Sequence, residues 1–260
     1  MKRITFFGGR RTATGPAALA VATAVIALGI ADPASPGDVG SAPSADPAAF
    51  ASLATAFLEA PTDPARAHAL RLAARSAGQL DSAIALFQAA LARDPRALPA
   101  RLELGLAHVD QLAAPDLDLK QRFILGGQAI ALFSEVLKED PAHWAARYAR
   151  GMTHVLFPRQ SRHSDPAVND LERLLHQQKT MEWRSYFVLA HIGLGDAYVV
   201  NKQKTLARDT WEEGKKLYGD QPELNARLKL APADMDSAVS TFRSLERPFD
   251  TDLSFLWAAP

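Results

Sequence analysis

Residues 80–105 read LDSAIALFQAALARDPRALPARLELG, and this stretch contains the pattern that decides the fold. Ala83 and Phe87 stand four residues apart, Pro95 follows, and Gly105 comes ten residues after the proline. The same order and spacing return further along the chain, in Ala129, Phe133, Pro141 and Gly151. A sequence that repeats about every 34 residues builds stacked pairs of helices, whose concave face usually holds another molecule.

Composition favours helices and excludes several classes of function. Alanine is the commonest residue, and alanine and leucine lose little entropy in a helix. The 29 basic and 29 acidic residues cancel, which argues against a nucleic-acid binder because phosphate contacts need a basic excess. The chain has no cysteine, so it contains no disulfide and no cysteine zinc site. Because the sequence also has no hydrolase or nucleotide-binding motif, we predict a protein that is not an enzyme and needs no cofactor.

The first 31 residues resemble a secretory signal peptide. Their start is positively charged, an apolar run covers residues 16–30, and small residues stand near its end at Gly29 and Ala31. This run is short for a membrane span, which needs about 20 apolar residues. We predict that residues 1–31 are cleaved and that the protein is periplasmic or secreted. The alternative is an uncleaved anchor in the inner membrane. Residues 32–46 are rich in Pro, Gly, Ser and Ala, and are predicted to be a flexible leader.

Asp-Pro pairs mark the predicted helix starts. Asp63-Pro64 and Asp165-Pro166 each join a good N-cap to a proline at the first helical position. Asp94-Pro95 and Asp140-Pro141 are each predicted to close one helix and open the next. We predict a leading helix, four helix pairs and two short final helices, over residues 47–59, 64–77, 81–93, 97–112, 122–138, 142–156, 166–178, 183–200, 204–218, 221–229 and 233–245.

These spacings resemble those of a tetratricopeptide repeat protein. In that family a small residue in the first helix of each pair lets the second helix approach closely, and an Ala and a Phe in the second helix fill the contact. The last copy here has Gly195, followed by Ala207-x3-Trp211. The resemblance implies an all-α solenoid of antiparallel helix pairs, with about four repeats and flanking helices over residues 47–245. Residues 246–260 would form a C-terminal tail.

Three departures interrupt the repeat. Arg71 stands where the first copy should have its glycine. The second copy carries an insert around residues 113–127, in which Gly126-Gly127 is predicted to mark a bend or the end of an inserted turn. The third copy has a longer turn over residues 158–165.

The resemblance also implies a binding surface. Residues three before, one after and four after the first-helix glycine form one stripe, which in this family lines the concave groove. The predicted groove is mainly apolar and consists of His68, Leu72, Arg75, Leu102, Leu106, Val109, Tyr148, Met152, Val155, Ile192, Asp196 and Val199. A partner peptide would bind there. We expect the chain itself to cover part of the groove, because so large an exposed apolar patch favours aggregation. The covering segment would be the leading helix, the insert around 117–125 or the tail at 253–257.

A second group of candidate residues lies in the turn over 158–165. Arg159, Arg162 and His163 are basic and precede a helix, so a phosphate or a carboxylate is a candidate ligand. His154 also lies near this turn, but it occupies the aromatic position of the repeat, and we assign no metal ligands.

The main prediction is an exported scaffold or adaptor that binds a partner protein of the bacterial envelope through its concave face. It would bind no nucleic acid, and would contact a membrane only through an uncleaved N-terminal anchor. The alternative is an accessory protein that binds a small ligand, an anion or a metal, at the turn over 158–165 or in a pocket beneath the insert over 113–127.

Overall fold

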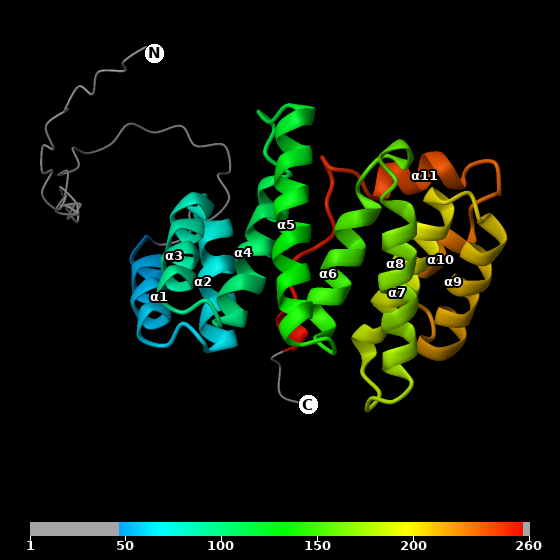
Figure 1. Ribbon diagram of the computed structural model, residues 1–260. Helices are drawn as coiled ribbons and strands as arrows, with labels where there is room; N and C mark the ends of the chain where they lie inside the picture. The colour runs from blue at the N-terminus through cyan, green and yellow to red at the C-terminus, as the bar shows by residue number, and fades with distance from the viewer. Residues whose placement is uncertain (1–46, 257–260) are drawn as a thin grey trace, which may run out of the picture. The chain divides into compact units, whose positions relative to one another are not determined.

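Eleven α-helices make up the described part of the chain, residues 47–256 of a computed structural model (Figure 1). These residues contain no strand, only an isolated bridge between Ser244 and Arg247. The predicted all-α fold is confirmed, and most helix ends lie within three residues of their predicted positions. The helices are α1 (Pro47–Glu59), α2 (Pro64–Ser76), α3 (Leu80–Arg93), α4 (Leu98–Gln111), α5 (Leu119–Glu139), α6 (Trp144–Val155), α7 (Ser164–Gln178), α8 (Val188–Val200), α9 (Lys204–Tyr218), α10 (Pro222–Leu228) and α11 (Met235–Phe242).

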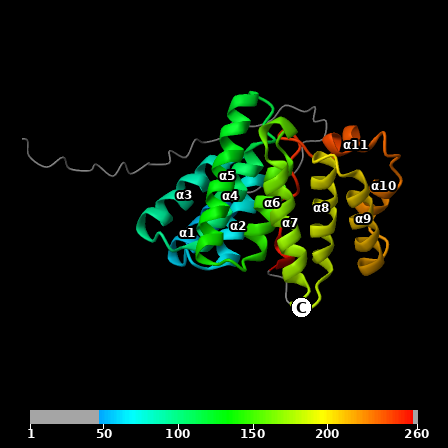
Figure 2. The same cartoon turned by 45° about the vertical axis from the view of Figure 1, so that its right-hand side comes forward.

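Consecutive helices pack as antiparallel pairs: α2 with α3, α4 with α5, α6 with α7, and α8 with α9 (Figures 1 and 2). The first helices of these pairs also touch one another in the order α2, α4, α6, α8, so they form one continuous layer. After the fourth pair, α10 packs on α9 and α11 packs on α8. This arrangement is the predicted solenoid of helix pairs.

Small residues allow the helices of a pair to approach closely. A Cβ atom added to Gly105 would lie 2.5 Å from the Phe133 ring, and one added to Gly195 would lie 2.0 Å from Trp211 Nε1. Both aromatic side chains are fully buried. The predicted contact between the repeat glycine and the aromatic residue is therefore confirmed in these two pairs.

Some helix starts differ from the prediction. The Asp63 carboxylate caps α2 as expected, accepting hydrogen bonds from two backbone N–H groups at 2.9 and 3.3 Å. Asp94 and Asp140 close α3 and α5, but the next helices begin only at Leu98 and Trp144. The reason is that each aspartate accepts from the N–H two residues further on, at 2.9 and 3.0 Å, which forms a turn before the helix. α7 also begins two residues earlier than predicted, at Ser164 instead of Pro166, so Asp165 lies in its first turn and His163 holds the N-cap position.

The insert over 113–127 lengthens a helix. After a short loop, α5 runs for 21 residues, and Gly126 and Gly127 lie within it. The bend or turn end predicted at these glycines is therefore wrong. Gly126 is required for packing, because a Cβ atom there would lie 2.7 Å from Phe157 Cζ, whereas Gly127 has no neighbour within 4 Å of such an atom.

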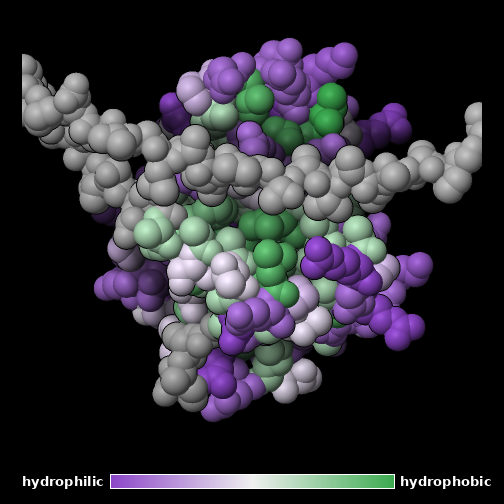
Figure 3. Space-filling view, turned by 90° about the vertical axis from the view of Figure 1, so that its left-hand side faces the viewer, coloured by the Kyte–Doolittle hydropathy of each residue, from purple (hydrophilic) through white to green (hydrophobic). Residues whose placement is uncertain are grey.

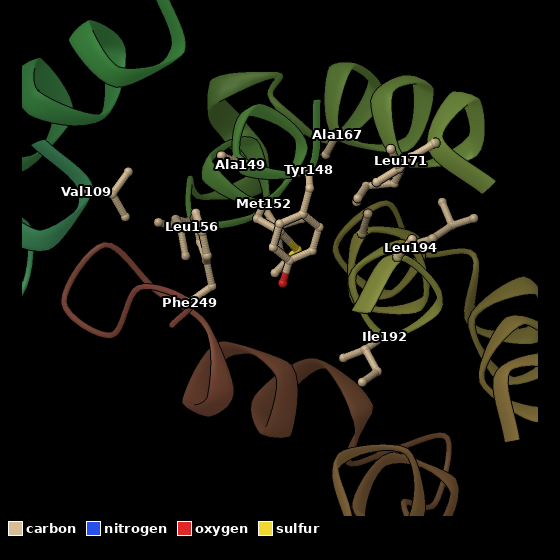
Figure 4. Packing of buried hydrophobic residues seen from close by; sticks show 14 of the residues in the cluster. Val109, Tyr148, Ala149, Met152, Leu156, Ala167, Leu171, Ile192, Leu194 and Phe249 are labelled. Atoms are coloured by element: carbon tan, nitrogen blue, oxygen red, sulfur yellow. The ribbon is translucent and has the colours of Figure 1, made fainter. Parts of the chain in front are cut away.

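Buried apolar side chains form two clusters. The smaller one belongs to α1–α4 and includes Phe57, which packs edge-on against Phe87 at 5.1 Å between ring centroids. The larger one extends from α4 to the C-terminal end of the described chain, and Figure 4 shows Tyr148 and Met152 of α6 at its centre. Seen from the α1–α3 end, apolar side chains gather in the middle of the surface with polar ones around them (Figure 3).

Several predictions concern residues that the structure does not describe. The signal peptide over 1–31, the leader over 32–46 and Trp257 lie outside residues 47–256. Among the helices that are described, none has the length and apolar character needed to cross a membrane.

Two glycine substitutions test the packing of the pairs. We expect Gly195→Ala to lower the free energy of unfolding by about 1–3 kcal/mol, because the new methyl group collides with buried Trp211. Gly127→Ala is the matched control on an exposed part of α5, and should raise stability by up to about 1 kcal/mol through helix propensity. Urea unfolding measures both values. Equal effects from the two changes would contradict the packing described above.

Candidate functional site

The predicted groove residues lie on one surface. The first helices α2, α4, α6 and α8 contribute three of the twelve residues each. The surface is covered, since all but Leu72 and Arg75 are buried. Eight of the twelve belong to the larger apolar cluster, namely Leu102, Leu106, Val109, Tyr148, Met152, Val155, Ile192 and Val199.

The chain's own C-terminal segment, residues 243–256, covers this surface. It leaves α11 and runs past α6 without forming a helix until its last three residues, as the red trace in Figure 1 shows. Phe249, Thr251 and Leu253 are buried, whereas the Asp250 and Asp252 side chains between them are 79% and 42% exposed. Side chains of an extended chain alternate between two faces in this way, and here one face of the segment is turned toward the groove. Phe249 packs edge-on against Tyr148, with 5.8 Å between the ring centroids.

Arg71 of α2 fixes the segment in place. Its guanidinium donates to Glu103 Oε2 at 2.5 Å, to Asp110 Oδ2 at 2.6 Å and to the backbone carbonyl of Thr251 at 2.7 Å. The Thr251 hydroxyl donates to Asp110 and accepts from Arg71 at 3.0 Å and from Arg75 at 2.8 Å. The Arg71 side chain has no exposed surface. A buried charge is tolerated only when its hydrogen bonds are made, so the segment completes this site.

The charges at this site stabilise one another. Burial alone would lower the pKa of Arg71, but the carboxylates of Glu103 and Asp110 outweigh it and raise the pKa above its usual value. Burial alone would raise the pKa of Glu103, but Arg71 and His68 hold it below its usual value. His68 also contacts the segment, with Nε2 at 3.0 Å from Ser254 Oγ.

The other end of the groove is covered by α10 and α11. Asp196 of α8 is fully buried and accepts two hydrogen bonds from Arg227 of α10, both at 2.6 Å. Arg243 lies near the same carboxylate and donates to Glu223 at 3.0 Å. Asp196, predicted as a groove residue, is therefore part of an ion pair that joins α10 to α8.

Sequence reasoning missed the residues that hold the segment in place. Glu103 and Asp110 lie two before and five after the repeat glycine, outside the stripe, and Thr251 lies outside the repeats altogether. The signal available was Arg71, an arginine at a position that the repeat reserves for a small residue. A charged side chain at a packed position requires buried partners.

The three residues of the predicted anion site have different surroundings. Arg159 and Arg162 are exposed. Arg159 lines a hollow of about 260 Å³ beside α11, together with Lys202 and Arg243. The His163 ring is stacked on Phe157 at 4.0 Å, and its Nδ1 lies 2.7 Å from His154 Nδ1. An anion site at this turn stays a prediction.

The other predicted sites are a metal or small-ligand site at the turn over 158–165 and a pocket beneath the insert over 113–127. Within residues 47–256, no group of three or more His, Asp or Glu side chains could hold a metal ion. Beneath the start of α5, the buried Arg122 guanidinium donates to the carbonyls of Leu112, Ala114 and Leu245. The Arg122 side chain and the C-terminal segment therefore lie beneath the insert over 113–127.

Comparison with known proteins supports the fold. No protein-family model matches the chain, and no curated protein does either. Among solved structures, the chain is similar to a thermophilic tetratricopeptide repeat (TPR) protein from Thermus thermophilus, with a TM-score of 0.54 and 18% sequence identity. The match covers 72% of this chain and 88% of that chain. The protein therefore has the fold of a TPR solenoid.

Protonation of His154 makes stability depend on pH. Burial, followed by the neighbouring His163, lowers the pKa of His154 to about 4. The unfolded chain binds this proton near pH 6.5, so stability is present above pH 6.5 and is lost as the pH falls toward 4. The loss amounts to at most about 3 kcal/mol. We expect His154→Phe to reduce this loss of stability between pH 6.5 and 4, as measured by urea unfolding at several pH values.

The control for this prediction is His176→Gln, which changes an exposed histidine on the neighbouring α7. This variant should keep the full loss of stability between pH 6.5 and 4. If both variants show the same pH dependence as the unmodified chain, His154 does not contribute to it.

Proposed function

We propose that this protein is an interaction scaffold that binds an extended segment of a partner protein in the groove formed by α2, α4, α6 and α8. The TPR fold suggests a scaffold of this kind. The single observation that carries the proposal is the C-terminal segment, which lies in that groove as an extended peptide would.

The segment shows which chemistry the groove accepts. The backbone carbonyl of Thr251 binds Arg71, and its hydroxyl binds Arg75 and Asp110. Aromatic and aliphatic side chains two residues away on either side fill apolar positions. Extended peptides are commonly recognised in this way, through main-chain hydrogen bonds and pockets for alternate side chains. A partner segment would carry a small hydroxyl residue, with one apolar residue two positions before it and another two positions after it.

A partner must compete with the chain's own segment. A tethered peptide is present at an effective concentration of about 1 mM or more. A partner must therefore overcome this local concentration of the segment, and binds more readily when the segment is displaced or when the partner is itself held nearby. The covered groove also hides an apolar surface that would favour aggregation.

The binding test uses a chain that is cut after it has folded. A specific protease site is inserted between Glu246 and Arg247, both of which are exposed. A fluorescein-labelled peptide with the sequence of residues 247–256, RPFDTDLSFL, is then added, and binding is followed by fluorescence anisotropy. We expect saturable binding to the cut chain and binding at least about tenfold weaker to the uncut chain, where the tethered segment competes.

Peptide variants identify the contacts that matter. Replacing Phe249 with Ala and Thr251 with Val in the labelled peptide should weaken binding about tenfold or more, because a buried ring and a buried hydroxyl are lost. A scrambled peptide of the same composition is the control. The proposal fails if the cut chain keeps its circular dichroism spectrum yet shows no preference for the native peptide.

We also propose that the scaffold is exported and works in the bacterial envelope. The support is the positively charged start and the apolar run over 16–30. This run is shorter than a typical membrane span, which favours a cleaved signal peptide over an anchor.

Mass spectrometry of the chain's N-terminus after expression in a bacterial host tests the export. We expect the mature chain to begin at Asp32 and to be found in the periplasmic or secreted fraction. An intact N-terminus in the membrane fraction would support the anchor instead. An intact N-terminus in the cytoplasmic fraction would contradict export.

A further inference from the structure

A hollow with polar walls lies between α5, α6 and α7, three helices that stand next to one another in Figure 1. Its volume of about 460 Å³ is within the range of small-molecule sites. The polar side chains that line it are Ser134 of α5, Arg150 and His154 of α6, and Asn169, Asp170 and Arg173 of α7. None of these residues belongs to the twelve of the groove.

Arg150 is held in position at this hollow and still has donors to offer. Its guanidinium donates to both oxygens of Asp170, at 2.6 and 2.7 Å, and to the Ser134 hydroxyl at 3.0 Å. A guanidinium carries five N–H donors, so these three bonds leave two for a ligand. The Arg150 side chain is 23% exposed, so a molecule in the hollow can reach it.

Two neighbouring side chains of α7 have no partner. Arg173 and Asn169 are exposed, and neither side chain makes a hydrogen bond or an ion pair with another described residue. Because they are four residues apart, they lie on the same face of the helix. A guanidinium and an amide that can both donate to an oxyanion therefore stand side by side.

The hollow has an excess of positive charge. Asp170 is bound by Arg150 and also lies 3.5 Å from Arg147. Burial lowers the pKa of Arg147, and the nearby charges of Arg150 and Arg173 lower it further, against the opposite effect of Asp170. Three guanidinium groups thus share one carboxylate, which leaves two positive charges to be balanced by a ligand.

This charge and these donors suit a phosphate group. The fork of a guanidinium matches two oxygens of a phosphate, and a phosphate monoester carries about two negative charges at pH 7. A carboxylate would balance only one of the two positive charges. Among the described residues that line the hollow, the only aromatic ring is that of His154, which is 8% exposed and offers little surface for a nucleotide base to stack on.

We propose that this hollow is a binding site for a phosphate group, carried by a small polar molecule or present as the free ion. Arg150 and Arg173 would bind its oxygens, and the side-chain amide of Asn169 would donate a further hydrogen bond. The site shares no residue with the groove, so it does not depend on the scaffold function.

Glycerol 3-phosphate and glycerol are a matched pair of probes, because they differ only in the phosphate group. We expect isothermal titration calorimetry of the full chain, at fixed ionic strength, to give a Kd below about 1 mM for glycerol 3-phosphate and no binding of glycerol. Acetate, with a single charge, should bind about tenfold more weakly than glycerol 3-phosphate.

Inorganic phosphate separates the two sources of the ligand. If it binds as tightly as glycerol 3-phosphate, the site recognises the phosphate ion alone. If it binds several-fold more weakly, the rest of the molecule contributes contacts. Both results support the proposed site.

Three variants connect the binding to this hollow. Arg173→Gln removes an exposed guanidinium that has no partner in the fold, and should weaken glycerol 3-phosphate binding about tenfold. Asn169→Asp puts a negative charge beside Arg173 and should also weaken binding about tenfold. Arg93→Gln removes an equally exposed arginine from α3, which does not line the hollow, and should leave the affinity unchanged.

The proposal is overturned by any of three results. The first is that neither glycerol 3-phosphate nor inorganic phosphate binds. The second is that acetate binds as tightly as they do. The third is that Arg173→Gln and Asn169→Asp, with circular dichroism spectra like that of the unmodified chain, bind as tightly as Arg93→Gln does.

Discussion

The burial of Arg71 is the constraint on which the rest of the structure depends. This side chain has no exposed surface, and its charge is compensated by two carboxylates of α4 and by the carbonyl of Thr251. Removing a charge from water costs several kcal/mol unless such partners are present. Two of the three residues that accept from Arg71 lie in the next repeat, and the third, Thr251, lies at the far end of the chain. Arg71 therefore joins the first two helix pairs to the C-terminal segment.

This anchor also sets the register of the segment. Side chains of an extended chain alternate between two faces, so a slip of one residue moves every side chain to the opposite face. With Thr251 held by Arg71, Phe249 and Leu253 enter the apolar groove, and Asp250 and Asp252 stay at the surface. A one-residue slip would bury the two aspartates against an apolar surface. The polar contact thus decides which apolar contacts form.

Much of the fold could be predicted because the repeat is local in sequence. The spacing from Gly105 to Phe133 and from Gly195 to Trp211 encodes contacts within one helix pair, and these contacts are present. Features with distant partners could not be predicted. In the sequence, Gly126 looks like a turn signal. Its actual role is to make room for Phe157, which lies outside the pair formed by α4 and α5, so the spacing of the repeat does not reveal it. Thr251 follows no periodicity, and its partners Arg71 and Arg75 lie more than 170 residues away. The helix starts after Pro95 and Pro141 differ from the prediction because an Asx turn and an N-cap share one sequence signal.

The charge balance around Arg71 bears on which partner segments the proposed scaffold could bind. Arg71 and Arg75 face the buried carboxylates of Glu103 and Asp110, and the exposed Asp250 carboxylate also lies 3.7 Å from Arg75. A free carboxylate in place of the Thr251 carbonyl would add a further negative charge next to the two buried carboxylates. A neutral carbonyl accepts a hydrogen bond from the guanidinium without that repulsion. In the proposed scaffold function, the groove would therefore bind the interior of a partner chain and not its carboxyl end, and selectivity would come from the side chains on either side of the bound carbonyl.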